Sequence, residues 1–194
     1  MNSSSLPSAY FDHIYAADAD PWSFESSAYE HAKYAATLAT LPRSRYERAF
    51  EIGCSIGVLT AQLAPRCRKL LAVDVAQAAL EQARQRCANL PQVELQCMQV
   101  PDELPSGDFD LIVVSEVGYY WSQADLQRAL DWMCGALRGR GHLLLVHWTP
   151  EVADCPLTGD DVHVIAHARA SDHGLKHLSG QRHTNYRIDI FEAA

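Results

Sequence analysis

Two short segments contain residues whose types and spacing suit the binding of a nucleotide-like cofactor. Glu51, Gly53 and Gly57 lie where an apolar run passes into a turn, and Asp74 follows 21 positions after Gly53 at the end of another apolar run. A helix that begins after such a turn exposes backbone N–H groups that can bind a carboxylate or phosphate. In nucleotide-binding α/β proteins, an acid about 20 residues past the first glycine accepts hydrogen bonds from ribose hydroxyls. The pair predicts an adenosine-containing ligand; a structural turn with an unrelated aspartate is the alternative.

The spacing of the glycines distinguishes between cofactors. A dinucleotide fingerprint, G-x-G-x-x-G, that began at Gly53 would require glycine at two positions that are Ser55 and Val58 here, so an NAD-dependent enzyme is disfavoured. The pattern E-x-G-x-G-x-G fits better, because Ser55 replaces only its middle glycine. This stretch resembles motif I of the class I S-adenosylmethionine-dependent methyltransferases.

The resemblance implies S-adenosyl-L-methionine as cofactor, with S-adenosyl-L-homocysteine as its product. In this family the loop backbone lies against the methionine part of the cofactor, and the acid that ends the second strand, here Asp74, holds the ribose. A side chain at Ser55 restricts positive φ and crowds the ligand, so we expect a differently shaped loop. Where the family commonly has an aspartate that meets the adenine amino group, this chain has Gln99, whose carbonyl can accept the same bond. The implied cofactor contacts are Trp22, Glu51, Gly53, Cys54, Ser55, Gly57, Asp74, Val75, Gln99, Val100 and Glu116.

The aromatic-rich segment 10–48 precedes the first expected strand. Its Asp20-Pro21-Trp22 run, followed by Ser27-x-Tyr29-Glu30-x-x-Lys33-Tyr34, resembles the N-terminal region of methyltransferases of the NodS type, which N-methylate a deacetylated glucosamine residue of a chitin-oligosaccharide signal. The resemblance implies a lid that folds over the cofactor; a fixed layer packed on the sheet is the alternative. We expect a helix over 28–39, capped by Ser26 or Ser27. The residues expected to share one face of it are Tyr29, Ala32, Lys33 and Ala36.

A second candidate group follows the apolar run 109–114. Ligands of an open parallel sheet bind beyond the carboxyl ends of its strands, at the switch point between the first strand and the fourth. The run Ser115-Glu116-Val117-Gly118-Tyr119-Tyr120-Trp121 is therefore expected at the methyl-transfer zone, and it resembles motif IV of NodS-like chains. His147 ends the next strand and is expected to take a proton or bind substrate. A loop acid, core aromatics and a structural histidine are the alternatives. The expected catalytic residues are Glu116, Tyr119, Tyr120 and His147.

Alternating strand and helix patterns predict one class I methyltransferase domain over residues 1–194, with segment 10–48 as its lid. We expect a Rossmann-like, seven-stranded, mostly parallel α/β sheet with helices on both faces. The expected strands are 50–52, 71–75, 93–97, 109–114, 142–148, 176–179 and 185–191, with residues 139–141 as a turn before the fifth. The expected helices after the lid are 58–64, 76–87, 125–137 and 162–170.

Composition limits the partners. The formal net charge of -8, from 16 Lys+Arg and 24 Asp+Glu, opposes binding to nucleic acid unless the basic residues gather on one face. The chain start lacks a basic and apolar leader, and no stretch of about 18 apolar residues occurs, so export and membrane spanning are disfavoured. Six cysteines without a C-x-x-C pair are typical of a reduced, cytoplasmic protein. His163 and His167, like His173 and His177, lie one helical turn apart without a telling carboxylate or cysteine, so no metal site is expected.

The leading functional hypothesis is methyl transfer to an amino sugar or another small amine, by a monomer or homodimer acting on a small-molecule or oligosaccharide acceptor. An O-methyltransferase acting on a small metabolite competes with it. A non-catalytic module that binds S-adenosylmethionine would keep Gly53, Gly57 and Asp74 but would need no acceptor pocket. The sequence leaves the identity of the acceptor open.

Overall fold

The computed structural model describes residues 4–194, which fall into two compact units. The N-terminal unit is Pro7–Gln99, and the C-terminal unit is Val100–Ala194 together with the segment that ends at Leu6. The expectations on the start of the chain and on a domain over 1–194 include residues 1–3, which lie outside the described residues. That the whole chain forms a single domain stays a prediction.

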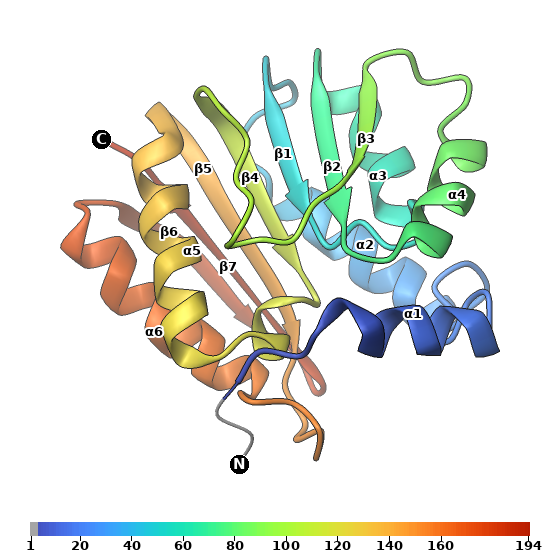
Figure 1. The fold of residues 1–194 in the computed structure, drawn as a ribbon. Coiled ribbons are helices and arrows are strands. Elements are labelled where there is room, and N and C mark those ends of the chain that lie inside the picture. The colour runs from blue at the N-terminus through green and yellow to red at the C-terminus, as the bar shows by residue number, and fades with distance from the viewer. Residues whose placement is uncertain (1–3) are drawn as a thin grey trace. The chain divides into compact units, whose positions relative to one another are not determined.

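The N-terminal unit contains three parallel strands in the order β3-β2-β1 (Figure 1). Every residue of β1 is buried, as expected for a short apolar strand of a parallel sheet that is covered on both faces. The helix α3 begins directly after the glycine turn, as the sequence predicts. The elements are α1 (Ser8–Ala17), α2 (Ala28–Thr40), β1 (Ala49–Ile52), α3 (Val58–Leu63), the 3-10 helix η1 (Ala64–Arg66), β2 (Leu70–Asp74), α4 (Gln77–Arg86) and β3 (Val93–Cys97).

The helix α2 begins where the sequence predicts, and it buries two charged side chains. Ser27 is its N-cap, and the side chain of Ser27 accepts a hydrogen bond from the Glu30 N–H. The buried residues are Glu30, Lys33, Tyr34 and Thr37, whereas Tyr29 is 37% exposed, so Lys33 is the member of the predicted face that is fully buried. The cause is an ion pair: the Lys33 ammonium lies 2.8 Å from a Glu30 carboxylate oxygen, which allows both charged groups to be buried.

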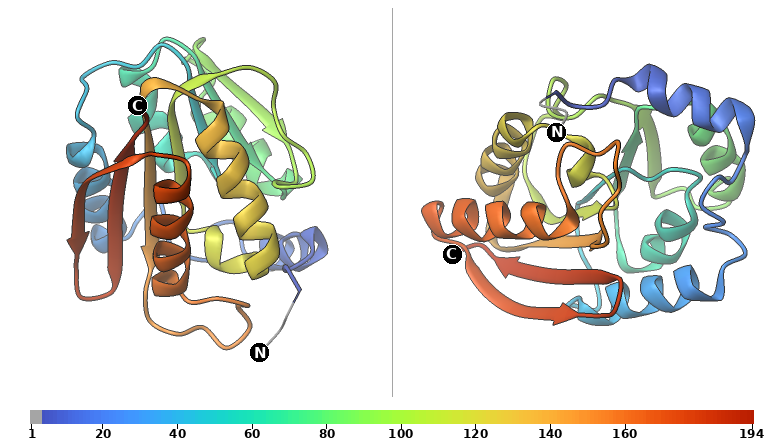
Figure 2. Two further views of the ribbon diagram at one scale, coloured as in Figure 1. Left: turned by 90° about the vertical axis from the view of Figure 1, so that its left-hand side faces the viewer. Right: turned by 90° about the horizontal axis from the view of Figure 1, so that it is seen from below.

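The C-terminal unit contains the strand order β4-β5-β7-β6, in which β4 and β5 are parallel and β7 is antiparallel to both of its neighbours. Its helices α5 and α6 lie on the same face of these strands (Figure 2). Seven mostly parallel strands with helices and a terminal antiparallel pair confirm the predicted fold class. The elements are β4 (Phe109–Ser115), the 3-10 helix η2 (Gly118–Tyr120), α5 (Gln123–Ala136), β5 (Leu137–Trp148), α6 (Gly159–Asp172), β6 (Lys176–Arg182) and β7 (Tyr186–Glu192).

The strand β5 begins earlier than predicted. The sequence places a turn at residues 139–141, but the chain continues from α5 into an irregular first part of β5 that starts at Leu137. The pairing with β4 shifts register between Phe109 and Leu111, and Arg140 has a φ of 61°. A Cβ on Gly141 would lie 2.8 Å from the Arg138 carbonyl oxygen. The glycines expected to break the chain therefore permit a bulge instead.

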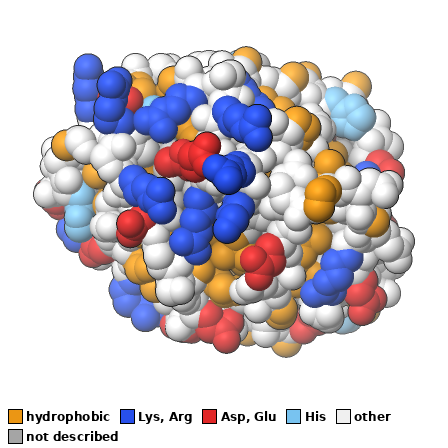
Figure 3. Space-filling model, turned by 90° about the horizontal axis from the view of Figure 1, so that it is seen from above, with side chains coloured by type: hydrophobic (Ala, Val, Ile, Leu, Met, Phe, Trp, Pro, Cys, Tyr) orange, Lys and Arg blue, Asp and Glu red, His pale blue; other side chains and the backbone are white. Residues whose placement is uncertain are grey.

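The distribution of charge and of cysteines bears on the expected partners. No helix in residues 4–194 is long and apolar enough to cross a membrane. Within the same residues no disulfide joins the six cysteines, four of which are buried. Lys and Arg side chains gather on the face drawn in Figure 3. In the N-terminal unit, the bridge between Tyr46 and Cys67 brings the arginine-containing segments 43–48 and 66–69 side by side. Positive charge is thus unevenly distributed despite the net charge of -8, and the exclusion of nucleic acid stays a prediction.

Candidate active site

The glycine turn after β1 is held by the end of β2. The N–H groups of Gly53 and Cys54 both donate to the Val73 carbonyl oxygen, at 2.9 and 3.0 Å, and the Gly57 N–H donates to the Cys54 carbonyl oxygen at 2.9 Å. Gly53 and Gly57 have φ values of 77° and 80°, which glycine adopts without strain. A Cβ on Gly57 would lie 3.0 Å from the Cα and Cβ of Ala83, so close packing on α4 also requires glycine there.

Asp74 lies where the sequence predicts a ribose ligand, at the carboxyl end of β2. Its Oδ2 accepts a hydrogen bond from the Ser55 N–H at 2.8 Å, and its Oδ1 accepts one from the Ala76 N–H at 2.9 Å. Burial raises the pKa of the Asp74 carboxyl, and the two N–H donors oppose that rise. Each carboxylate oxygen has two lone pairs, so this half-buried group keeps acceptor capacity for hydroxyls. The arrangement fits a ribose.

Ser55 is brought into contact with the N-terminal segment. It adopts a φ of 51°, which lies in the left-handed region, even though a side chain at this position restricts positive φ. Its Oγ lies 2.5 Å from the Tyr15 hydroxyl, and the buried Tyr15 ring makes an edge contact with Trp22, whose centroid is 5.6 Å away. Trp22 in turn stacks on Phe24 at 5.5 Å. The aromatic part of segment 10–48 therefore lies beside the turn, while its function as a lid stays a prediction.

The remaining predicted cofactor residues differ in exposure. Cys54 is buried in the turn, and burial raises the pKa of its thiol well above the ordinary value, which leaves it a neutral packing group. Val75 is half-buried directly after β2. Gln99 is exposed two residues after β3 ends, and Val100 is buried at the start of the C-terminal unit. Contacts of these four with a cofactor stay predictions.

Glu51 is a buried acid within β1, one residue before the strand ends. It is 1% exposed, and its Oε2 has no hydrogen-bond partner among the residues that the structure describes. Burial raises the pKa of its carboxyl to about 7. A buried carboxyl without a partner is costly to ionise, and such groups gather at functional sites.

Glu116 is the first residue after β4, and the fold holds it in a strained conformation. Its φ is 56°, which costs a residue with a Cβ on the order of 1–3 kcal/mol. Its backbone N–H donates to the Val146 carbonyl oxygen at 2.9 Å. Its Oε2 accepts hydrogen bonds from the Tyr119 hydroxyl and the Trp148 N–H, both at 2.8 Å. These three bonds orient the carboxylate. The hydrogen bond from the Trp148 N–H could not be predicted from the sequence, since the backbone of almost any residue can supply such a donor.

Tyr119 and Tyr120 complete this group, as the sequence predicts. Their rings make an edge contact with centroids 4.7 Å apart. Burial, together with the nearby Glu116, raises the pKa of the Tyr119 hydroxyl well above its usual range, so it remains a donor toward the carboxylate. The His147 ring also makes an edge contact with Tyr119, with centroids 5.7 Å apart, so the structure brings all four predicted catalytic side chains together around the η2 turn.

His147 is fully buried and acts on the backbone of the same turn. The Gly118 N–H donates to its Nε2 at 3.1 Å, so the ring proton is on Nδ1, which lies 3.2 Å from Nε2 of His163. Nδ1 of His163 lies 2.6 Å from Oδ2 of Asp189. Nε2 of His147, the nitrogen that would accept a proton, thus already accepts a hydrogen bond from the Gly118 N–H. This contact favours a positioning role for His147. Sequence reasoning missed His163 and Asp189 as its support.

The raised pKa of Glu51 predicts a pH-dependent stability. A carboxyl with a higher pKa in the folded state destabilises the fold as it ionises, so this cost is absent below about pH 4.5 and complete above about pH 7. Glu51→Gln keeps the shape without the charge. Its free energy of unfolding should exceed that of wild type at about pH 8 by up to about 3 kcal/mol, and the difference should shrink toward about pH 5.

Urea denaturation of both proteins across this pH range measures the difference. Glu47→Gln is the matched control, because the Glu47 side chain is 61% exposed and should give no such pH-dependent gain. A constant difference between wild type and Glu51→Gln over the range would contradict an ionisation near neutral pH.

A family model and curated relatives of this chain point to the same protein family. A family model described as Nodulation protein S (NodS) matches residues 13–160, more than half of the chain. Nodulation protein S of Sinorhizobium fredii is 32% identical over 127 residues, which are 64% of this chain and 59% of that protein. Nodulation protein S of Bradyrhizobium diazoefficiens is 37% identical over 102 residues, 52% of this chain and 49% of that protein. The chain thus spans about half of the length of these curated relatives, or slightly more.

Solved structures agree. The crystal structure of a candidate methyltransferase from Pseudomonas syringae is 39% identical, with a TM-score of 0.75 over 86% of this chain and 99% of that chain. The N-methyltransferase NodS of Bradyrhizobium japonicum WM9 in complex with S-adenosyl-L-homocysteine has a TM-score of 0.83 over 96% of this chain and 98% of that chain. Its identity of 23% makes this a likeness of fold. The match of the family model to most of the sequence decides the family, and the chain belongs to the NodS family of class I methyltransferases.

Proposed function

We propose that the protein is an S-adenosylmethionine-dependent methyltransferase that N-methylates a small amine, such as an amino sugar. The main support for this cofactor is the carboxylate of Asp74, which two backbone N–H groups orient beside a glycine turn. Membership of the NodS family supports the reaction. The amine is supported by the relative from Bradyrhizobium japonicum, which is named an N-methyltransferase.

The N-terminal unit would hold the cofactor. Asp74 accepts hydrogen bonds from the ribose hydroxyls, and the backbone of Gly53 and Ser55 lies against the methionine part. Glu51, with its unpartnered buried oxygen, is suited to attract a cationic amino group toward the turn. Gln99 accepts a bond from the adenine amino group. When bound, S-adenosylmethionine supplies a methyl group that its sulfonium charge has already activated.

The C-terminal unit would hold the acceptor. The Glu116 carboxylate, oriented by the Tyr119 hydroxyl and the Trp148 N–H, hydrogen-bonds the incoming amine and attracts its developing positive charge. The face of Tyr120 stabilises the same cation. The new nitrogen–carbon bond forms as the carbon–sulfur bond breaks, and the nitrogen then loses its proton to the carboxylate or to water. Correct positioning alone supplies about 7–11 kcal/mol in reactions of this kind, so a rigid η2 turn matters more than further acid-base groups.

His147 keeps that turn in place in this proposal. It accepts the Gly118 N–H, and a Cβ on Gly118 would lie 2.9 Å from its Nε2 and 2.7 Å from a Val162 methyl carbon. The turn, the histidine and α6 are therefore tightly packed. We no longer assign His147 the transfer of a proton, because the nitrogen with the lone pair faces a backbone donor.

The cofactor assignment predicts the effect of Asp74→Ala. Loss of a charged acceptor for the ribose hydroxyls should weaken S-adenosylmethionine binding by about 1–3 kcal/mol in calorimetry. Asp108→Ala is the control, because this exposed acid lies in the C-terminal unit and pairs there with Arg138. If Asp74→Ala bound S-adenosylmethionine as tightly as the wild-type protein, or if the wild-type protein bound NAD, the proposed cofactor site would be wrong.

A lid predicts slower exchange of backbone amide hydrogens in residues 10–34 when the cofactor is added, because bound cofactor orders a segment that otherwise opens. Tyr15→Phe removes the hydroxyl contact with Ser55 and should reduce this slowing. Tyr29→Phe, in an exposed tyrosine of the same segment, should not. Hydrogen exchange detected by mass spectrometry gives the answer, and protection that the cofactor leaves unchanged would favour the fixed layer.

The acceptor assignment can be tested by a screen of amino sugars, chito-oligosaccharides and small alcohols. We expect the mass of an amine-containing compound to increase by about 14 daltons. The rate of this methylation should rise with pH as the amine loses its proton. Glu116→Gln keeps the shape of the side chain and should lower kcat about 10- to 1,000-fold while changing cofactor affinity little.

Glu151→Gln, in an exposed acid after β5, serves as the control for charge. Methylation of hydroxyls alone would overturn the amine and leave the cofactor assignment standing. Cofactor binding without any methylated product would indicate a binding module.

A further inference from the structure

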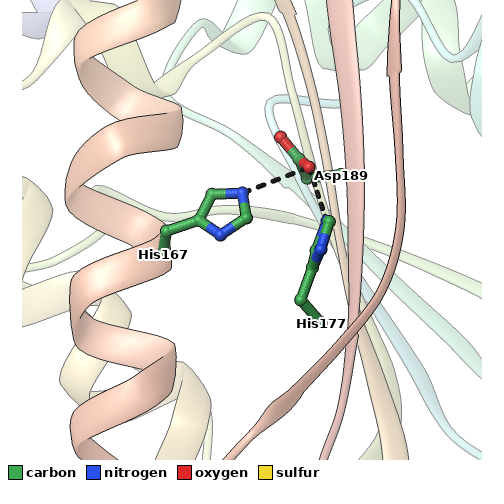
Figure 4. A group of neighbouring side chains, drawn as sticks. All are labelled: His167, His177 and Asp189. Carbon is green, nitrogen blue, oxygen red and sulfur yellow. Dashed lines mark hydrogen bonds and ion pairs between the residues drawn. The ribbon is translucent and has the colours of Figure 1, made fainter.

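Three side chains from different elements of the C-terminal unit bring their donor atoms together away from the η2 turn. We call His167 of α6, His177 of β6 and Asp189 of β7 the His-Asp cluster (Figure 4). Nε2 of His167 lies 3.2 Å from Oδ1 of Asp189, and Nε2 of His177 lies 2.7 Å from the same oxygen. All three donor atoms lie within 4.8 Å of one another. The carboxylate is buried, whereas the imidazoles are 35% and 37% exposed, so the cluster opens to solvent on one side.

The second oxygen of Asp189 is held in the manner of a metal-bound carboxylate. Its Oδ2 lies 2.6 Å from Nδ1 of His163 and 2.6 Å from Nε of Arg187. Carboxylates that bind metals commonly have such outer partners, which orient the other oxygen toward the ion. Arg187 also lies 3.2 Å from Nε2 of His167, so its guanidinium would have to move from that nitrogen when an ion binds.

The backbone of β6 packs closely against the donor atoms. The pairing of β6 with β7 shifts register between His177 and Ser179, which places Gly180 opposite Asp189. A Cβ on Gly180 would lie 2.6 Å from Oδ1 of Asp189 and 3.3 Å from Nε2 of His177. Any larger residue at this position would therefore collide with two of the donor atoms and push them apart.

We propose that the His-Asp cluster binds one divalent transition-metal ion, with zinc as the reference ion. Zinc binds imidazole nitrogen and carboxylate oxygen at about 2.0–2.2 Å in a tetrahedral arrangement, which separates neighbouring donors by about 3.4 Å. The His167 to Asp189 separation of 3.2 Å already fits, and His177 needs to retreat by a fraction of an ångström. Solvent supplies the fourth ligand. Magnesium and calcium prefer sites made of oxygen, so the two imidazoles select against them.

The ion would join α6 to the strand pair β6–β7. Asp189 also contacts His163, which contacts His147 under the η2 turn, so the ion would stiffen the support of that turn without taking part in chemistry. This site is proposed without reliance on the proposed methyl transfer.

The test is zinc binding by the full chain after treatment with a chelator. Competition with a chromophoric zinc chelator should show one ion per wild-type chain, and cobalt in place of zinc should give the visible absorption of a four-coordinate site. His167→Ala and His177→Ala should each weaken zinc binding at least about tenfold. Gly180→Ala keeps all three donors, but its methyl group would collide with Oδ1 of Asp189 and displace it, so this variant should weaken binding as well.

His173→Ala is the matched control. His173 is 34% exposed and lies 3.1 Å from one Asp131 oxygen, so it has the same exposure and a carboxylate partner but lies outside the cluster. Circular dichroism checks the fold of each variant, and His167→Gln replaces His167→Ala if the alanine variant does not fold. The proposal is overturned if the wild-type chain takes up no zinc at micromolar concentration, or if the cluster variants bind zinc as tightly as His173→Ala.

Discussion

The clamp of the Asp74 carboxylate by two backbone N–H groups is the interaction on which the candidate cofactor site depends. One of these groups belongs to Ser55 in the turn after β1, and the other to Ala76 at the start of α4. A single side chain thus fixes the shape of the turn and its own orientation toward a ligand. Because the carboxylate is removed from bulk water, these N–H bonds offset the cost of burying its charge. Preorganisation of this kind lowers the free energy that cofactor binding must supply for ordering.

Each unit has a non-glycine residue in a left-handed conformation among its candidate site residues, Ser55 in the N-terminal unit and Glu116 in the C-terminal unit. Ser55 is held by the contact between its hydroxyl and Tyr15, and Glu116 is held by bonds from Tyr119 and Trp148. Such conformations cost about 1–3 kcal/mol and persist only where the surroundings determine them. In both places the bonds that maintain the strain also orient a polar group.

A buried carboxylate organises the C-terminal unit as well. Asp189 contacts His163, His177 and Arg187, and these partners hold its pKa well below the usual range even though burial acts in the opposite direction. Since a buried charge without partners would be strongly destabilising, the convergence of basic side chains on this residue is required by its position in β7. The same convergence brings together the donor atoms of the proposed metal site, and it supports the buried His147.

The sequence by itself determined the order of the strands and of the α-helices from α2 onward, the turn at Gly53 and Gly57 with Asp74 after it, and the grouping of Glu116 with two tyrosines; it did not indicate α1. These depend on local patterns: apolar runs, glycine spacing and the ends of strands. The tertiary structure decided which face of α2 is buried, which nitrogen of His147 is occupied, and that Asp189 meets histidines from two other elements. Helical spacing had identified paired histidines but no acidic ligand, since that ligand lies on another strand. Partners distant in the chain are chosen by packing and by the need to neutralise buried charge, which no local pattern records.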